Sequence, residues 1–139
     1  MMNAKEYLSQ ARWLDMRINS KLAQVDSLHS LATKATSTLS DVPPSGTRNV
    51  HRMEDIICKI VTLENEINAD IDKLVDLKRD ITGCIMSVQD MEFQSLLEKR
   101  YLCLMTWEQI AAENGCSVRN IHMMHGEALK MVIVPENLH

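Results

Sequence analysis

Helix-breaking residues are scarce in this sequence. Its 139 residues include only four glycines and three prolines, and residues that favour β-strands are rare outside helical patterns. Glycine and proline interrupt helices and mark turns, so their scarcity favours long, uninterrupted helices. We therefore expect an all-α fold.

Patterns that indicate membrane or secreted proteins are also missing. No apolar run approaches the roughly 20 residues that span a membrane, and no signal sequence opens the chain. The four cysteines, Cys58, Cys84, Cys103 and Cys116, form no C-x-x-C pair, which argues against a disulfide framework. These absences predict a cytoplasmic protein without a membrane partner.

Motifs of enzymes and metalloproteins are absent too. The sequence has no glycine-rich phosphate loop, no nucleophile elbow and no metalloprotease helix. His122 and His125 lie three residues apart, but zinc needs four ligands, and Cys103 and Cys116 are too far apart to form a close pair. Cys116 and His125 are better explained as packing residues. We expect no catalytic residue, no metal and no cofactor.

Two long segments carry apolar residues at steps of three and four, the spacing that lines one face of an α-helix. The first segment covers about residues 3–39, and the second about 50–88. The apolar positions are Leu8, Ala11, Leu14, Ile18, Leu22, Val25, Leu28, Ala32, Ala35 and Leu39, then Met53, Ile57, Ile60, Leu63, Ile67, Ile71, Leu74, Leu77, Ile81, Ile85 and Val88.

Residues 40–49 separate these segments and include Pro43, Pro44 and Gly46, which favour a loop. Two helices of matching length with a short loop form an antiparallel hairpin, so residues 1–86 are predicted to be a long helical hairpin arm. A two-helix hairpin leaves part of each stripe exposed. We therefore expect a homodimer through these helices, as in a coiled coil, or packing on the C-terminal part; a plain spacer is the simpler alternative.

The pattern changes to short helices with tight joints over residues 87–139. A first helix is predicted over about 90–104. Thr106 is a good N-cap for a second helix over 107–114, and Gly115 would end it in the left-handed conformation.

Ser117 would then cap a third helix from Val118 to about Met131. Ile110 and Ile121 would point inward from the second and third helices. A short helix, a tight turn and a capped helix form a helix-turn-helix module, which we predict for this part of the chain.

The residues of this part carry a family resemblance. They are Leu96 to Leu102, Thr106 to Ala111, Ser117, Ile121, His122 and His125 to Lys130. The segment resembles region four of bacterial sigma factors, and is most similar to phage and prophage late-gene regulators of the ArpU and RinA type. The close match covers about a third of the chain, and the N-terminal helices match in general character. The resemblance implies binding to double-stranded DNA and control of a phage promoter in a bacterial host cell.

In such a module the third helix enters the major groove, and its first turns meet base edges. Ile121, Met124 and Ala128 share the core face, so the opposite face would read DNA. Arg119 suits guanine and Asn120 suits adenine, whereas lysine and arginine elsewhere suit phosphates. The predicted DNA-binding residues are Arg119, Asn120, His122, Met123, Lys130, Lys99 and Arg100.

The charge balance keeps other functions open. The chain has 15 basic and 19 acidic residues, and residues 87–139 contain seven acids against four bases. This balance favours an alternative in which the module binds RNA polymerase or another regulator and scarcely touches DNA. A small DNA-packaging subunit, which would form a ring, is a third possibility. A transcriptional regulator that binds promoter DNA remains the leading interpretation.

Overall fold

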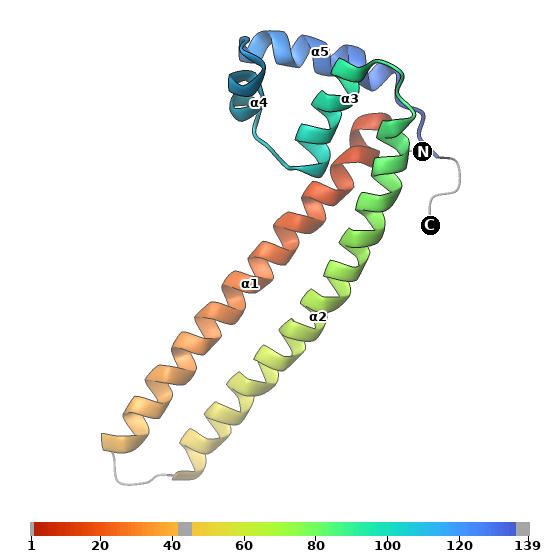
Figure 1. Ribbon diagram of the computed structural model, residues 1–139. Helices are drawn as coiled ribbons and strands as arrows, with labels where there is room; N and C mark the ends of the chain where they lie inside the picture. Colours follow the sequence, from red (N-terminus) through yellow and green to blue (C-terminus); the bar gives the residue numbers. More distant parts are fainter. Residues whose placement is uncertain (1, 42–45, 136–139) are drawn as a thin grey trace. The chain divides into compact units, whose positions relative to one another are not determined.

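The computed structural model describes residues 2–41 and 46–135, with side chains described in 2–36 and 50–135. Within these residues every regular element is a helix and no strand occurs, which confirms the all-α prediction. The elements are α1 (Ala4–Asp41), α2 (Gly46–Met86), α3 (Met91–Leu97), the π-helix η1 (Glu98–Leu102), α4 (Trp107–Asn114) and α5 (Val118–Lys130) (Figure 1).

The break between the two long helices is shorter than predicted. α1 continues to Asp41 and α2 begins at Gly46, so residues 46–49 are helical although the loop was predicted over 40–49. Proline is compatible with the start of a helix, so a helix can begin soon after a proline pair. Residues 42–45, which include both prolines, lie outside the described residues.

Contacts divide the chain into two compact units. The first unit consists of residues 1–14 and 74–139, and the second unit of residues 15–73. Both long helices therefore contribute to both units. The predicted boundary between residues 86 and 87 stays a prediction, but the first unit holds residues from both sides of it.

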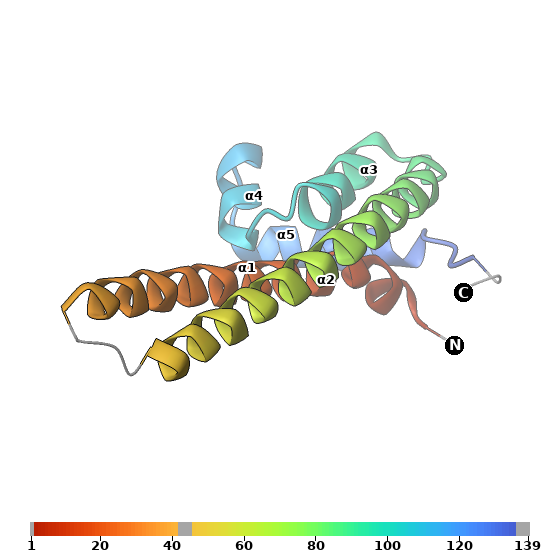
Figure 2. The same ribbon diagram turned by 90° about the horizontal axis from the view of Figure 1, so that it is seen from below.

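In the second unit α1 and α2 run antiparallel (Figures 1 and 2). The two helices share an apolar seam. Ile18 and Val25 of α1 are buried there, with Ile56, Ile60 and Ile67 of α2. The predicted stripe was wrong at three positions, because Leu22, Ile57 and Ile71 are 45%, 51% and 41% exposed.

Two charged residues occupy the seam where the stripe was wrong. Lys21 Nζ donates a hydrogen bond to Asp70 Oδ2 at 2.7 Å, and the two side chains are only 12% and 7% exposed. This hydrogen bond holds the pKa of Asp70 below its usual value. Counting apolar residues alone selects Leu22 and Ile71, each one residue beyond the charged pair. The steps of three and four instead run through Lys21 and Asp70 themselves.

The first unit has a core built from residues far apart in the sequence. Tyr7, Leu8 and Ala11 of α1 are at most 2% exposed, and they pack with the end of α2 and with the C-terminal helices. The remaining buried members of this cluster are Ile81, Cys84, Ile85, Val88, Leu97, Tyr101, Ala128 and Val132. The start of α1 therefore belongs to the same core as α5.

The helix that was predicted over residues 90–104 differs in its second half. Asp90 caps it, accepting hydrogen bonds from the backbone N–H groups of Glu92 and Phe93. After Leu97 the backbone widens into η1, in which the N–H of Cys103 donates to the carbonyl of Glu98. The segment ends at Leu104, whose φ of 57° lies in the left-handed region and turns the chain toward α4.

Candidate nucleic-acid interface

The ends of α4 are fixed by local hydrogen bonds. The Thr106 hydroxyl accepts from the N–H of Gln109 at 3.2 Å, and Gln109 Oε1 accepts from the N–H of Thr106 at 2.9 Å. This reciprocal pair is a capping box. Gly115 ends the helix with a φ of 64°, a conformation that glycine adopts without steric cost. The predicted bounds of 107–114 are confirmed.

Only three residues, Gly115 to Ser117, connect α4 to α5. The N–H of Cys116 donates back to the carbonyl of Ala111, and the Ser117 hydroxyl accepts from the N–H of Asn120 at 3.1 Å. Ser117 is thus the N-cap of α5, as predicted. Because each end is capped, the start of α5 is held in a defined position next to α4.

A small apolar core packs α3, α4 and α5 together. Leu96, Ile110 and Ile121 are fully buried, and Ala111 is 4% exposed. The short side chain of alanine lets two helices approach closely. Cys116 packs half-buried against this core, which confirms the prediction that it is a packing residue.

The face of α5 opposite this core is exposed. Arg119, Asn120 and His122 are all exposed, and Met123 is 64% exposed. In the described part of the chain, the Arg119 guanidinium and the Asn120 side-chain amide form no hydrogen bond or ion pair. Both groups are therefore available to a ligand. Lys130 lies about three turns further along α5. Its Nζ forms an exposed ion pair with Glu127 Oε1 at 3.3 Å, which is a weak interaction in water.

Lys99 and Arg100, the two residues of η1 that were predicted to contact phosphates, already form interactions within the chain. Lys99 Nζ donates to Asn114 Oδ1 at 2.9 Å, which ties η1 to the end of α4. Arg100 donates to the carbonyl of Met105 at 3.0 Å, and its guanidinium carbon lies 4.1 Å from the centroid of the Trp107 ring. Arg100 is half-buried, and burial lowers the pKa of its guanidinium.

Trp107 is the centre of an aromatic cluster that the sequence did not reveal. Its ring lies 4.6 Å from the rings of both His122 and His125, between centroids. Since those histidines are three residues apart on one helix, a ring from a neighbouring helix meets both. The spacing of the histidines was a usable signal, but nothing local indicated that Trp107 would face them.

His125 lies in the core, as predicted, and it also forms a buried hydrogen bond. Its Nε2 is 2.5 Å from the hydroxyl oxygen of Tyr101. Burial, with a smaller contribution from nearby positive groups, lowers the pKa of His125 to about 4. Burial also raises the pKa of Tyr101 to about 12. The Tyr101 hydroxyl therefore keeps its proton and donates a hydrogen bond to Nε2 of the neutral His125, and this bond fastens α5 to η1.

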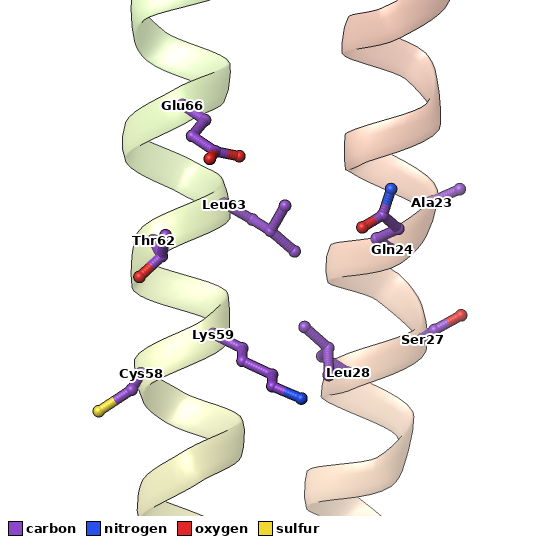
Figure 3. A pocket seen from close by; sticks show the side chains of 9 residues that line it. All are labelled: Ala23, Gln24, Ser27, Leu28, Cys58, Lys59, Thr62, Leu63 and Glu66. Atoms are coloured by element: carbon purple, nitrogen blue, oxygen red, sulfur yellow. The ribbon is translucent and has the colours of Figure 1, made fainter.

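The described residues line hollows in both units. One, of about 550 Å³, lies beside the first turn of α5 and is lined by Asn120, Glu92 and Met124, among others. Another, of about 730 Å³, lies in the second unit between α1 and α2 (Figure 3). There Leu28 and Leu63 point toward each other across the gap. No residue that was predicted to contact DNA lines this second hollow.

Neither a metal site nor a membrane-spanning helix occurs among the described residues. They contain no group of three or more His, Cys, Asp or Glu residues placed to hold a metal ion. No helix among them has both the length and the apolar character that crossing a membrane requires.

Comparisons with known proteins place the chain in a family. No curated protein and no solved structure matches it. Residues 35–132 match the family described as "Protein of unknown function (DUF1492)". The matched region is more than two thirds of the chain and contains α2 to α5 complete. The chain therefore belongs to the DUF1492 family.

Proposed function

We propose that the chain is a DNA-binding transcriptional regulator in which α4 and α5 form a helix-turn-helix module. The observation that carries the proposal is the exposure of the Arg119 and Asn120 side chains, which form no hydrogen bond within the described residues. They lie exposed and unengaged in the first turn of a helix whose start is capped and whose opposite face is buried. In helix-turn-helix modules this turn of the second helix meets base edges.

The roles of the residues follow from their surroundings. Arg119 donates two hydrogen bonds to guanine, and Asn120 pairs with adenine. His122 and Met123 line the same face and contact the groove walls. Lys99 and Lys130 bind phosphates from the two sides, while Arg100 supports the Trp107 ring and presents its remaining N–H groups to a phosphate.

The hairpin of α1 and α2 serves as a dimerisation arm in this proposal. Besides the seam, α2 carries a row of exposed apolar side chains, Val50, Ile57, Val61 and Ile71, which are 41–51% exposed. At 100° per residue these four lie within one arc of the helix. Apolar side chains that recur on one side of a long helix favour association with a second helix.

The resemblance to phage regulators of the ArpU and RinA type supports a phage or prophage promoter as the target. A second function is favoured by one observation, the seven acids against four bases in residues 87–139. In that alternative the module binds RNA polymerase or another regulator, and DNA affinity is secondary.

DNA binding is tested by fluorescence anisotropy with the duplex upstream of the protein's own gene and with a scrambled duplex. We expect specific binding that weakens steeply with salt, and we expect Arg119→Ala or Asn120→Ala to reduce the preference by roughly 1–3 kcal/mol. Arg52→Ala and Asn68→Ala are matched controls on exposed positions of α2. Equal affinity for the two duplexes at every salt concentration would contradict specific binding. It would direct the search to polymerase subunits.

A further inference from the structure

The start of α1 brings two more cations to the C-terminal helices. Tyr7, Leu8 and Ala11 are buried in the same cluster as Tyr101 and Ala128, so the first turns of α1 are packed against η1 and α5. Lys5 and Arg12 lie three residues before and four residues after Leu8. Being seven residues apart, they are on the same side of α1, about 10 Å apart along its axis.

These two cations lie near others of the same sign. Arg12 adds to the effect of burial in lowering the pKa of Arg100. Lys5, Arg100 and His122 add to the effect of burial in lowering the pKa of His125. Arg100 in turn covers the Trp107 ring, and the His122 ring lies 4.6 Å from that ring, between centroids, at a tilt of 48°. These positive or titratable side chains form a basic cluster, which consists of Lys5, Arg12, Arg100 and His122.

Within the part of the chain that the structure describes, little offsets the positive charge of the basic cluster. In the described residues, Lys5 and Arg12 take part in no ion pair or hydrogen bond, unlike Lys21 and Lys130. Glu108, on the first turn of α4, is the acid that acts on Arg100 in the opposite direction. Solvated surface cations usually lie apart from one another. Here the packing of the core holds the side chains of the basic cluster close together, so that their positive charges repel one another. An anion bound between them relieves that repulsion.

We propose that Lys5 and Arg12 bind backbone phosphates of the DNA that α5 reads, so that the interface combines the start of α1 with the C-terminal helices. The geometry favours this position, because the start of α1 packs in the same cluster as Tyr101 and Ala128, and His122 is exposed on the face of α5 that is proposed to read DNA. The ligand is a phosphodiester backbone and not a base edge, since Lys5 and Arg12 lie on α1 and not on the helix that is proposed to enter the groove. The inference rests on the proposed function.

The test is a salt titration of DNA binding by the full chain and by the double variant K5A/R12A. Each phosphate contact contributes about 0.9 to the slope of log affinity against log salt concentration. We expect the double variant to lose affinity and to reduce the magnitude of this slope by about 1.8. We also expect an equal loss on the upstream and the scrambled duplex, because a phosphate contact carries no sequence information.

Two controls separate charge from folding. R52A/K59A removes an arginine and a lysine that are also seven residues apart on a long helix and exposed, and it should leave the slope unchanged. K5R/R12K keeps both charges and should retain the slope of the unaltered chain. Circular dichroism checks that each variant remains helical.

The outcomes distinguish the two proposals. If the unaltered chain binds DNA and K5A/R12A keeps its slope, the inference about α1 is overturned and the proposed function stands. If K5A/R12A and R52A/K59A reduce the slope equally, the effect is one of net charge, and the inference is again overturned. If the unaltered chain binds neither duplex, the proposed function fails and this inference fails with it.

Discussion

The hydrogen bond between Tyr101 and His125 places a titratable ring inside the core of the first unit. In the folded chain His125 stays neutral until the pH approaches its pKa of about 4, because burial penalises the charged form. In an unfolded chain histidine takes up a proton near pH 6.5. The unfolded state therefore binds more protons than the folded state over the interval between these values.

This difference predicts acid sensitivity that one substitution removes. The free energy of unfolding should fall by about 3 kcal/mol as the pH is lowered from 7 to 4, in addition to any change caused by carboxylates. His125→Gln should lose this part of the pH dependence, because its amide still accepts from Tyr101 but does not titrate. The measurement is urea denaturation across that pH range.

His29→Gln is the matched control, since it removes an exposed imidazole from α1. It should follow the pH dependence of the unaltered chain. If His125→Gln followed it as well, His125 would have the same affinity for protons in both states, and the buried hydrogen bond would not control stability.

At the scale of the helices, the Lys21–Asp70 pair sets how α1 and α2 align in the second unit. A buried ion pair contributes little relative to well-packed apolar residues, but removing one partner leaves the other buried and uncompensated. We expect Lys21→Met and Asp70→Leu each to lower the urea midpoint markedly, and K21M/D70L to recover most of that loss. A double variant with the summed loss of both single variants would contradict this account.

Arg17→Met provides the control for this series. Arg17 also approaches Asp70, with Nε 3.8 Å from Oδ2, but its side chain is 65% exposed. An exposed pair at that distance is worth little in water. We therefore expect Arg17→Met to change the midpoint much less than Lys21→Met does.

Elements defined by local contacts were predictable from the sequence, and those defined by distant contacts were not. The bounds of α4 and the cap of α5 follow from Thr106, Gly115 and Ser117, whose partners lie within five residues. The π-helix was missed because no residue type marks where an α-helix widens. The places of Lys21 and Asp70 were missed because a search for apolar periodicity skips charged residues.

The same distinction applies to the candidate interface. Exposure of Arg119, Asn120, His122 and Met123 was expected from helical periodicity, and the structure has them exposed. The partial engagement of Arg100 depends on Trp107 and on the carbonyl of Met105, which only the turn at Leu104 brings into reach. The role proposed for the start of α1 depends on contacts across most of the chain, which a single sequence does not indicate.

At the scale of the whole molecule, the exposed row on α2 predicts self-association. I57D/V61D should convert a dimer to a monomer, measured as the mass from sedimentation equilibrium, because charge on that row cannot be buried against a second copy. C58D/T62D adds the same two charges one residue further along, on another side of the helix, and should leave the mass unchanged.

A monomeric mass for the unaltered chain would exclude the dimer. A ring of many copies would favour the DNA-packaging alternative, because closed rings are built from head-to-tail contacts and not from one self-complementary row. Equal effects of both double variants would mean that the exposed row is not the contact surface.

The residues that form the core of the first unit are synthesised at widely separated times. Tyr7, Leu8 and Ala11 leave the ribosome well before Ala128 and Val132, with which they share a cluster. At 5–20 residues per second the interval is on the order of ten seconds. Throughout it, the apolar side of the first turns of α1 has no completed core to enter. The nascent chain therefore offers a binding surface to chaperones that the finished protein no longer has.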